Sequence, residues 1–289
     1  MYKVAILGCE NSHANSFLRH ARAHPETYGE IEFVGVYSDD REAAGKLSAE
    51  FGVSVMERFD ALVGQVDGLL ITARHGRDHY RFAKPYLASG IPMFIDKPIT
   101  VSEEDAVAFM KAAKASKVQV CGGSVLIHSP YVQYLKRLAE RETYGKTLGG
   151  YLRAPINLVN PYGDFHFYCQ HLVQSMAEIY GYEPKSVQAF DRGNVISFVV
   201  RYADYDVTAV FTEKNYLYYA SLSAEKKVLG SDFDASAGFN EEFAEFLRLL
   251  HGGKGADYAE FIKPVFIQNA MERALRSGRE EPVHTVEEI

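Results

Sequence analysis

Short apolar runs alternate with longer amphipathic segments through the first part of the chain. Runs too short for a typical helix predict buried strands at residues 4–7, 31–37, 53–55, 67–72, 91–95 and 118–121. Helical spacing between these runs predicts helices over about 14–24, 41–51, 59–63, 78–89 and 103–115. Strands that alternate with helices at these lengths pair in parallel through right-handed crossovers. The pattern predicts an α/β fold with a doubly wound parallel sheet.

The pattern changes after about residue 122. Most of the strands predicted beyond this point follow one another directly, which favours antiparallel pairing; they lie at 151–154, 186–190, 195–202, 207–212 and 216–223. Helices are predicted over 130–140, 165–180, 239–250 and 258–276. We expect two domains, residues 1–122 and 123–289. An exposed aromatic sheet face in the second would join copies of the chain into a homodimer or homotetramer.

Composition narrows the range of partners. The 289 residues carry a net charge of −7, which argues against nucleic acid or an anionic membrane as the main partner. The three cysteines are widely spaced, which fits a reducing compartment and neither a disulfide framework nor a zinc site. No apolar run approaches the roughly 18–20 residues of a membrane span. We therefore expect a cytoplasmic protein with a small-molecule ligand.

The stretch Ile91–Pro98 carries the first candidate for chemistry. An apolar run ends abruptly in Asp96, Lys97 and Pro98, as a buried strand does at the carboxyl edge of a parallel sheet. Open α/β sheets bind ligands at that edge. Pro98 disfavours helical geometry at Lys97, so the chain leaves the sheet extended. Lys97 is thus a candidate ligand contact, and the alternative is a strand end with a solvated charge pair.

The turn after the first predicted strand is a partial nucleotide-binding motif. Gly8 occupies the first position of G-x-G-x-x-G, but Glu10 and His13 replace the second and third glycines. Asn11 and Ser12 supply donors at a helix N-terminus, where the helix dipole favours an anion. A carboxylate at position 10 is unfavourable near phosphates unless it turns away or meets a cation. A purely structural turn remains the alternative.

The second predicted strand ends at Ser38, Asp39 and Asp40. A carboxylate about 20 residues beyond the glycine turn can accept hydrogen bonds from the adenosine ribose and repel a 2′-phosphate. Asp39 is the better placed of the two acids, which favours NAD over NADP. The alternative is that Asp39 and Asp40 only cap the following helix.

Two further segments contain candidate side chains. The loop from Thr72 to His79 follows another strand at the same edge. In the helix predicted over 165–180, His171 and Gln174 share a face, which indicates either a pocket wall or a solvated surface. His166 lies about 140° round that helix from His171, so the two cannot chelate one metal from a regular helix. No histidine spacing in the chain matches a metal site.

Together these features resemble the Gfo/Idh/MocA family, named for glucose–fructose oxidoreductase and inositol dehydrogenase. Asp96-Lys97-Pro98 is similar to the family's (Glu/Asp)-Lys-Pro signature. The pair Thr72 and His79, and His171 in the second domain, match family positions as well. The resemblance covers essentially the whole chain. It implies a Rossmann domain followed by an α/β domain for substrate binding and oligomerisation.

The resemblance also implies an activity. Family members use NAD or NADP to transfer a hydride to or from a hydroxyl-bearing carbon of a sugar, an inositol or a related polyol. Lys97 would form a hydrogen bond with the reacting hydroxyl, and His171 would be the main general acid/base. The implied cofactor contacts are Gly8, Asn11, Ser12, His13, Ser38, Asp39, Thr72, His79, Asp96 and Lys97. The implied substrate contacts are Lys97, His128, His166 and Gln174.

Two positions depart from the family pattern. Phe167 stands where the family commonly has an aspartate, four residues before the histidine, and His128 stands where arginine is common. Phe167 and the altered glycine turn favour the alternative of a non-catalytic protein that binds a nucleotide or a sugar. Lys97 and His171 favour an enzyme.

Overall fold

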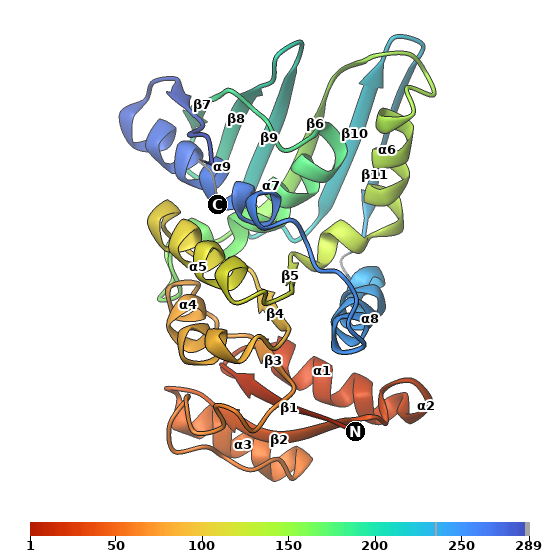
Figure 1. Cartoon of the computed structure of the whole chain (residues 1–289). Helices are drawn as coiled ribbons and strands as arrows, with labels where there is room; N and C mark the ends of the chain where they lie inside the picture. Colours follow the sequence, from red (N-terminus) through yellow and green to blue (C-terminus); the bar gives the residue numbers. More distant parts are fainter. Residues whose placement is uncertain (235, 287–289) are drawn as a thin grey trace. The chain divides into compact units, whose positions relative to one another are not determined.

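The structure is a computed structural model that describes residues 1–234 and 236–286 (Figure 1). The chain divides into two compact units. Of the described residues, the first unit comprises Met1–Gly123 together with Phe243–Phe261, and the second comprises Ser124–Glu242 and residues 262–286. The predicted division, in contrast, assigned every residue after 122 to the second domain. None of the described helices is long and apolar enough to cross a membrane.

The first unit contains a five-stranded parallel sheet of order β2-β1-β3-β4-β5. Its strands are β1 (Tyr2–Leu7), β2 (Ile31–Tyr37), β3 (Gly68–Ile71), β4 (Met93–Asp96) and β5 (Val120–Gly123). Its helices are α1 (Ser12–Ala23), α2 (Pro25–Tyr28), α3 (Arg41–Phe51), α4 (Arg77–Ala83) and α5 (Glu103–Ala115), with the 3₁₀ helix η1 (Lys84–Ser89) after α4. The predicted doubly wound sheet is confirmed.

Local chemistry sets the helix boundaries in the first unit. Asp40 and Ser102 cap α3 and α5 by accepting the backbone N–H of the residue three positions on. The helix predicted over 78–89 is instead α4 followed by η1, because Pro85 has no N–H to continue an α-helix. The strand predicted at 53–55 is only a single bridge from Val55 to Val36, and 59–63 forms turns.

A segment from late in the chain completes the core of the first unit. Helix α8 (Phe239–Leu250) lies mostly in the segment 243–261 that belongs to this unit. The ring of Phe243 stacks on Tyr28, with 4.2 Å between centroids, and meets Phe17 edge to face. The apolar stripe of α8 therefore covers α1 and α2, a long-range pairing that sequence spacing cannot reveal.

The second unit is built on a seven-stranded sheet of order β11-β10-β6-β9-β8-β7-β12. Only β6 and β9 pair in parallel; the other neighbours are antiparallel, which confirms the predicted sheet. The strands are β6 (Thr147–Ile156), β7 (Ser186–Asp191), β8 (Val195–Arg201), β9 (Asp206–Glu213), β10 (Tyr218–Ala224), β11 (Lys227–Phe233) and β12 (Glu281–Pro282). The helices are η2 (Val125–His128), α6 (Pro130–Glu140), α7 (His166–Tyr180), η3 (Ser236–Gly238) and α9 (Tyr258–Ser277).

One face of the seven-stranded sheet is covered and the other is open. Alternate strand residues such as Phe198 and Phe211 form one buried core with α6, α7 and α9 (Figure 1). Their neighbours on the opposite face, such as Val199 and Val210, are half-exposed. Strand β11 escaped prediction because this edge strand is largely exposed and lacks apolar alternation.

Candidate functional site

The strand order of the parallel sheet reverses between β1 and β3, and Gly8 directly follows β1 at the carboxyl edge. The backbone of Gly8 has φ of +90°, and a Cβ there would lie 2.2 Å from the amide nitrogen of Ala73. Thr72 is buried and donates its hydroxyl to the carbonyl of Gly8. Only glycine fits this close approach. The turn therefore sits at the topological switch point, where open α/β sheets bind ligands.

The carboxylate of Asp96, at the end of β4, is fully buried and connects this turn to β4, which lies two strands from β1 in the sheet. Its Oδ2 lies 2.7 Å from Nδ1 of His13 and 3.3 Å from the side-chain Nδ2 of Asn11. Its Oδ1 accepts the backbone N–H of Lys97. Asn11 is also the N-cap of α1. Burial raises the pKa of Asp96, but the facing His13 and Lys97 outweigh it and lower that pKa to about 2.

Lys97 follows β4 at the same carboxyl edge, with only 6% of its surface exposed. Its peptide bond to Pro98 is cis. His79 braces this segment, because its two ring nitrogens lie 2.8 Å from the carbonyl oxygen of Ala73 and 3.3 Å from that of Ile99. His79 is fully buried, so its visible role is to position the loop; its predicted contact with a cofactor stays a prediction.

Glu10 turns back toward the sheet. Its carboxylate accepts hydrogen bonds from Cys9 N at 2.8 Å, Ser38 Oγ at 2.7 Å and Arg74 N at 3.1 Å. These donors follow β1, β2 and β3, so the carboxylate joins the ends of three adjacent strands. Burial and the charge of Glu10 raise the pKa of the Cys9 thiol to about 12, which keeps Cys9 protonated.

Asp39 points to a different set of partners. The hydroxyl of Tyr37 donates to it at 2.7 Å, and Arg81 forms an ion pair with its other oxygen. Partial burial raises the pKa of Asp39, but Tyr37 and Arg81 outweigh it and hold that pKa below its ordinary value. Ser12, the first residue of α1, is exposed.

In the second unit, His171 of α7 lies against Ser124, the residue that follows β5. Ser124 Oγ is 2.7 Å from Nδ1 of His171, and the Ser124 backbone N–H donates to Gln174 Oε1 at 2.8 Å. All three residues are buried. Ser124 thus brings together two predicted site residues, His171 and Gln174.

A buried polar chain continues from Gln174 to α9. Gln170 donates to Gln174 Oε1 at 3.0 Å, and Gln268 of α9 donates to Gln170 at 3.3 Å. His166 then lies 3.4 Å from Gln268 Oε1 and 3.3 Å from Glu272 Oε2. The ring of His166 is therefore directed to α9, on another side of α7 from His171. His128 ends η2, and burial lowers its pKa.

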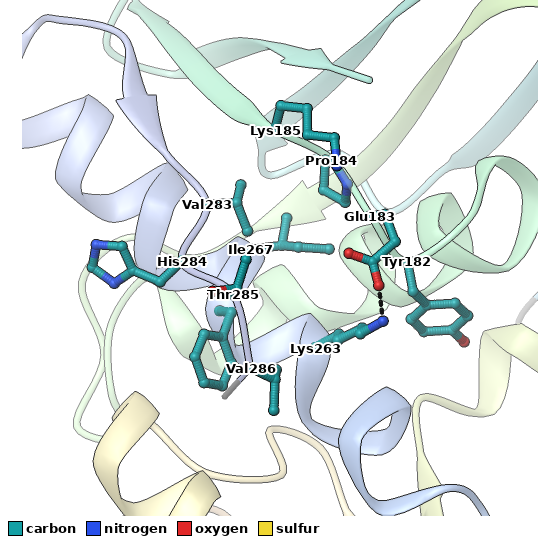
Figure 2. Close-up of a pocket in the computed structure, with 11 residues that line it drawn as sticks. Tyr182, Glu183, Pro184, Lys185, Lys263, Ile267, Val283, His284, Thr285 and Val286 are labelled. Atoms are coloured by element: carbon teal, nitrogen blue, oxygen red, sulfur yellow. Dashed lines mark hydrogen bonds and ion pairs between the residues drawn. The ribbon is translucent and has the colours of Figure 1, made fainter. Parts of the chain in front are cut away.

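The second unit also encloses a small cavity of about 60 Å³, whose lining does not include His171 (Figure 2). Residues 182–185, α9 and the tail 283–286 surround it, and Lys263 pairs with Glu183 at its rim. Such a space suits a few water molecules and no substrate. Among the described residues, no group of three or more His, Cys, Asp or Glu side chains is arranged to hold a metal ion.

Comparison with known proteins identifies the class of the first unit. Residues 2–124 match the oxidoreductase family with an NAD-binding Rossmann fold. UDP-N-acetylglucosamine 3-dehydrogenase of Acidithiobacillus ferrooxidans is 27% identical over 117 residues, which are 40% of this chain and 37% of that protein. The matched segment thus spans well under half of the relative's length.

Solved structures share the fold over nearly the whole chain. Scyllo-inositol dehydrogenase from Lactobacillus casei, solved with NAD(H) and scyllo-inositol, aligns with a TM-score of 0.83 at 15% identity, covering 98% of this chain and 99% of that one. The WlbA dehydrogenase from Chromobacterium violaceum, solved with NADH and UDP-GlcNAcA, aligns with a TM-score of 0.84 at 16% identity, covering 99% and 97%. At these identities the likeness establishes the fold.

Residues 2–124 thus match the family that the Asp-Lys-Pro segment resembles, which confirms the predicted resemblance over this part of the chain. The matched family is one of NAD-binding oxidoreductases. Sequence spacing did not reveal Ser124 or the long-range contacts of Glu10, because His171 lies 47 residues from Ser124, and Ser38 and Arg74 lie 28 and 64 residues from Glu10.

The buried charge of Asp96 predicts that the stability of the fold depends on pH in the acid range. Its pKa is about 2 in the folded chain against an ordinary 3.8, so the carboxylate stabilises the fold fully above pH 4 and loses this contribution as pH falls toward 2. The full contribution is about 2 kcal/mol, roughly half of which is lost by about pH 3. Asp96→Asn cannot show this loss.

Urea unfolding of the wild type and of Asp96→Asn at about pH 5.5 and pH 3 measures the effect. We expect the stability advantage of the wild type to shrink by about 1 kcal/mol at the lower pH. An advantage that is equal at both pH values would contradict a depressed pKa for Asp96.

Proposed function

We propose that this protein is an NAD-dependent oxidoreductase acting on a hydroxyl-bearing carbon of a sugar, an inositol or a related polyol. The observation that carries the proposal is a buried lysine, Lys97, directly after β4 at the switch-point edge of an NAD-binding Rossmann sheet. A charged lysine with 6% exposure is costly to bury unless it is paired, and the carboxylate of Asp96 lowers this cost; buried charge pairs of this kind cluster at functional sites. Relatives of the same fold were solved with scyllo-inositol and UDP-GlcNAcA, which supports this substrate class.

The first unit fits the cofactor at the glycine turn. Gly8 permits the close turn that a dinucleotide needs, and α1 begins shortly after it, where the helix dipole favours an anion, although the N–H of His13 already donates to Asn11 Oδ1. When bound, NAD accepts the hydride that leaves the substrate carbon. The other contacts assigned to the cofactor belong to this proposal, namely Asn11, Ser12, His13, Ser38, Thr72, His79, Asp96 and Lys97.

The chain's own residues handle the proton. Oxidation of the substrate CH–OH group releases a proton from the hydroxyl as the hydride leaves the carbon. We assign Lys97 to hydrogen-bond this hydroxyl and His171 to take up the proton as general base. In the reverse reaction, His171 returns the proton to the carbonyl oxygen. His128, His166 and Gln174 are proposed as substrate contacts, although the ring of His166 is directed to α9.

Ser124 is proposed to set the orientation of His171. A serine hydroxyl can donate to the imidazole nitrogen or accept from it, so it supports the histidine both with and without its catalytic proton. The N–H of Leu126 also donates to Ser124 Oγ, which fixes the hydroxyl in place. Ser124 thus supplies a polar partner for His171 in a chain whose residue four positions before this histidine is the apolar Phe167.

The first test combines cofactor binding with turnover. NAD should raise the thermal midpoint of the wild type, since it binds only the native state. With a substrate found among inositols and nucleotide-linked sugars, Lys97→Ala and His171→Ala should each cut turnover by about 100-fold or more. Lys111→Ala, an exposed lysine on α5, is the matched control.

Two results would sink the proposal. One is the absence of any thermal shift at millimolar NAD. The other is wild-type turnover in a purified Lys97→Ala variant that still binds NAD.

The role of Ser124 has its own test. We expect Ser124→Ala to lower kcat by about 10- to 100-fold and to change its pH profile, because the imidazole loses its fixed orientation. Ser124→Thr retains the hydroxyl and should restore most of the activity. NAD affinity should stay unchanged in both variants. If Ser124→Thr is as slow as Ser124→Ala, the hydroxyl is not what matters.

The open face of the seven-stranded sheet is proposed to join copies of the chain. Light scattering should give a multiple of the single-chain mass for the wild type. Val210→Arg, on the half-exposed face, should reduce that mass, whereas Val63→Arg, an exposed site in the first unit, should not. A wild type with the mass of one chain would refute self-association.

A further inference from the structure

Glu10 replaces the glycine that lets a dinucleotide approach the first turn. The contacts of its carboxylate indicate a role in cofactor binding. We infer that Glu10, and not Asp39, supplies the carboxylate that binds the adenosine ribose hydroxyls and disfavours NADP. The inference rests on the proposed cofactor binding and adds to it the residue that selects between the two nicotinamide cofactors.

The position of the carboxylate is fixed by three donors. Cys9 N, Ser38 Oγ and Arg74 N lie 2.7–3.1 Å from its oxygens and come from the ends of β1, β2 and β3. Two of these donors are backbone groups, so the position does not depend on flexible side chains. Glu10 is therefore held at the carboxyl edge of the sheet, on the β1–β3 side where its order reverses.

Ser38 connects Glu10 to the place where a ribose-binding acid is expected. An acid at the end of the second strand normally accepts from the ribose hydroxyls. Here the buried residue directly after β2 is Ser38, and its hydroxyl donates to Glu10 Oε2. The carboxylate of Glu10 thus lies at the end of β2, although Glu10 itself belongs to the turn after β1.

Asp39 already binds two other side chains. Its oxygens receive the hydroxyl of Tyr37 and the guanidinium of Arg81, and its side chain is 55% exposed. Arg81 also pairs with Asp78 on α4. Asp39 therefore has a structural role that accounts for its charge.

The chemistry of Glu10 suits a ribose and opposes a phosphate. A carboxylate has about four acceptor positions, and Oε1 of Glu10 accepts only one of its three hydrogen bonds, so it can accept from a ribose hydroxyl as well. A 2′-phosphate would instead bring about two negative charges against a fixed carboxylate. Hydrogen bonds to a charged group correspond to about 10- to 100-fold in affinity.

Calorimetric titration of NAD and NADP tests the inference without any substrate. The wild type should bind NAD at least about 10-fold more tightly than NADP. Glu10→Gln should weaken NAD by about 10- to 100-fold and bring the two affinities close together. Ser38→Ala keeps the carboxylate but removes one of its donors, so it should weaken NAD less.

Glu50→Gln is the matched control. Glu50 lines the same cleft of about 370 Å³ as Glu10, and its carboxylate is bonded to Arg19 and Asn15. The substitution makes the same charge change, and we expect the ratio of NAD to NADP affinity to stay as in the wild type. Thermal unfolding without nucleotide verifies that each variant is folded.

Three outcomes would overturn the inference. If Asp39→Asn removes the preference and Glu10→Gln does not, Asp39 binds the ribose. If Glu10→Gln binds NAD more tightly than the wild type, Glu10 obstructs the site. If the wild type binds neither nucleotide, the proposed function itself fails, whereas the first two results leave cofactor binding intact.

Discussion

The buried carboxylate of Asp96 is the constraint on which the carboxyl edge of the first unit depends. A charge with no exposed surface is tolerated only when its partners are fixed around it. Those partners are His13 and Asn11 from the turn after β1 and the backbone of Lys97 after β4. The same interactions therefore hold the glycine turn and the lysine in one arrangement. In the proposed function, this single group would couple the cofactor site to the position of Lys97.

In the second unit, His171 is held in position without a carboxylate beside it. His171 is oriented by a hydroxyl, and that hydroxyl's own backbone is held by Gln174. Because a backbone N–H can only donate, Gln174 must present its carbonyl oxygen, which in turn directs Gln170 and Gln268. Amides of this kind do not pass protons on. The chain toward Glu272 is therefore an orienting network, and a proton taken up by His171 in the proposed reaction would leave by another route.

Periodicity and turn chemistry predicted most of the fold. The bounds of β2, α3, α5, α6 and α8 agree with prediction, because apolar spacing and caps such as Ser102 are local signals. Strand β11 could not be predicted, since an exposed edge strand needs no apolar pattern. The site followed the same rule. Gly8 and Lys97 carry local signatures, whereas Ser124 and Glu10 acquire their roles from partners that only the folded chain brings close.

A crystal structure of the chain with NAD bound is the most direct test of the central claim that the carboxyl edge of the parallel sheet is the cofactor site. We expect the pyrophosphate at the turn from Gly8 to Ser12, the adenosine ribose against Glu10, and the nicotinamide on the Lys97 side of the same edge. A cofactor bound elsewhere on the chain, or a ribose held by Asp39 with Glu10 displaced, would contradict it.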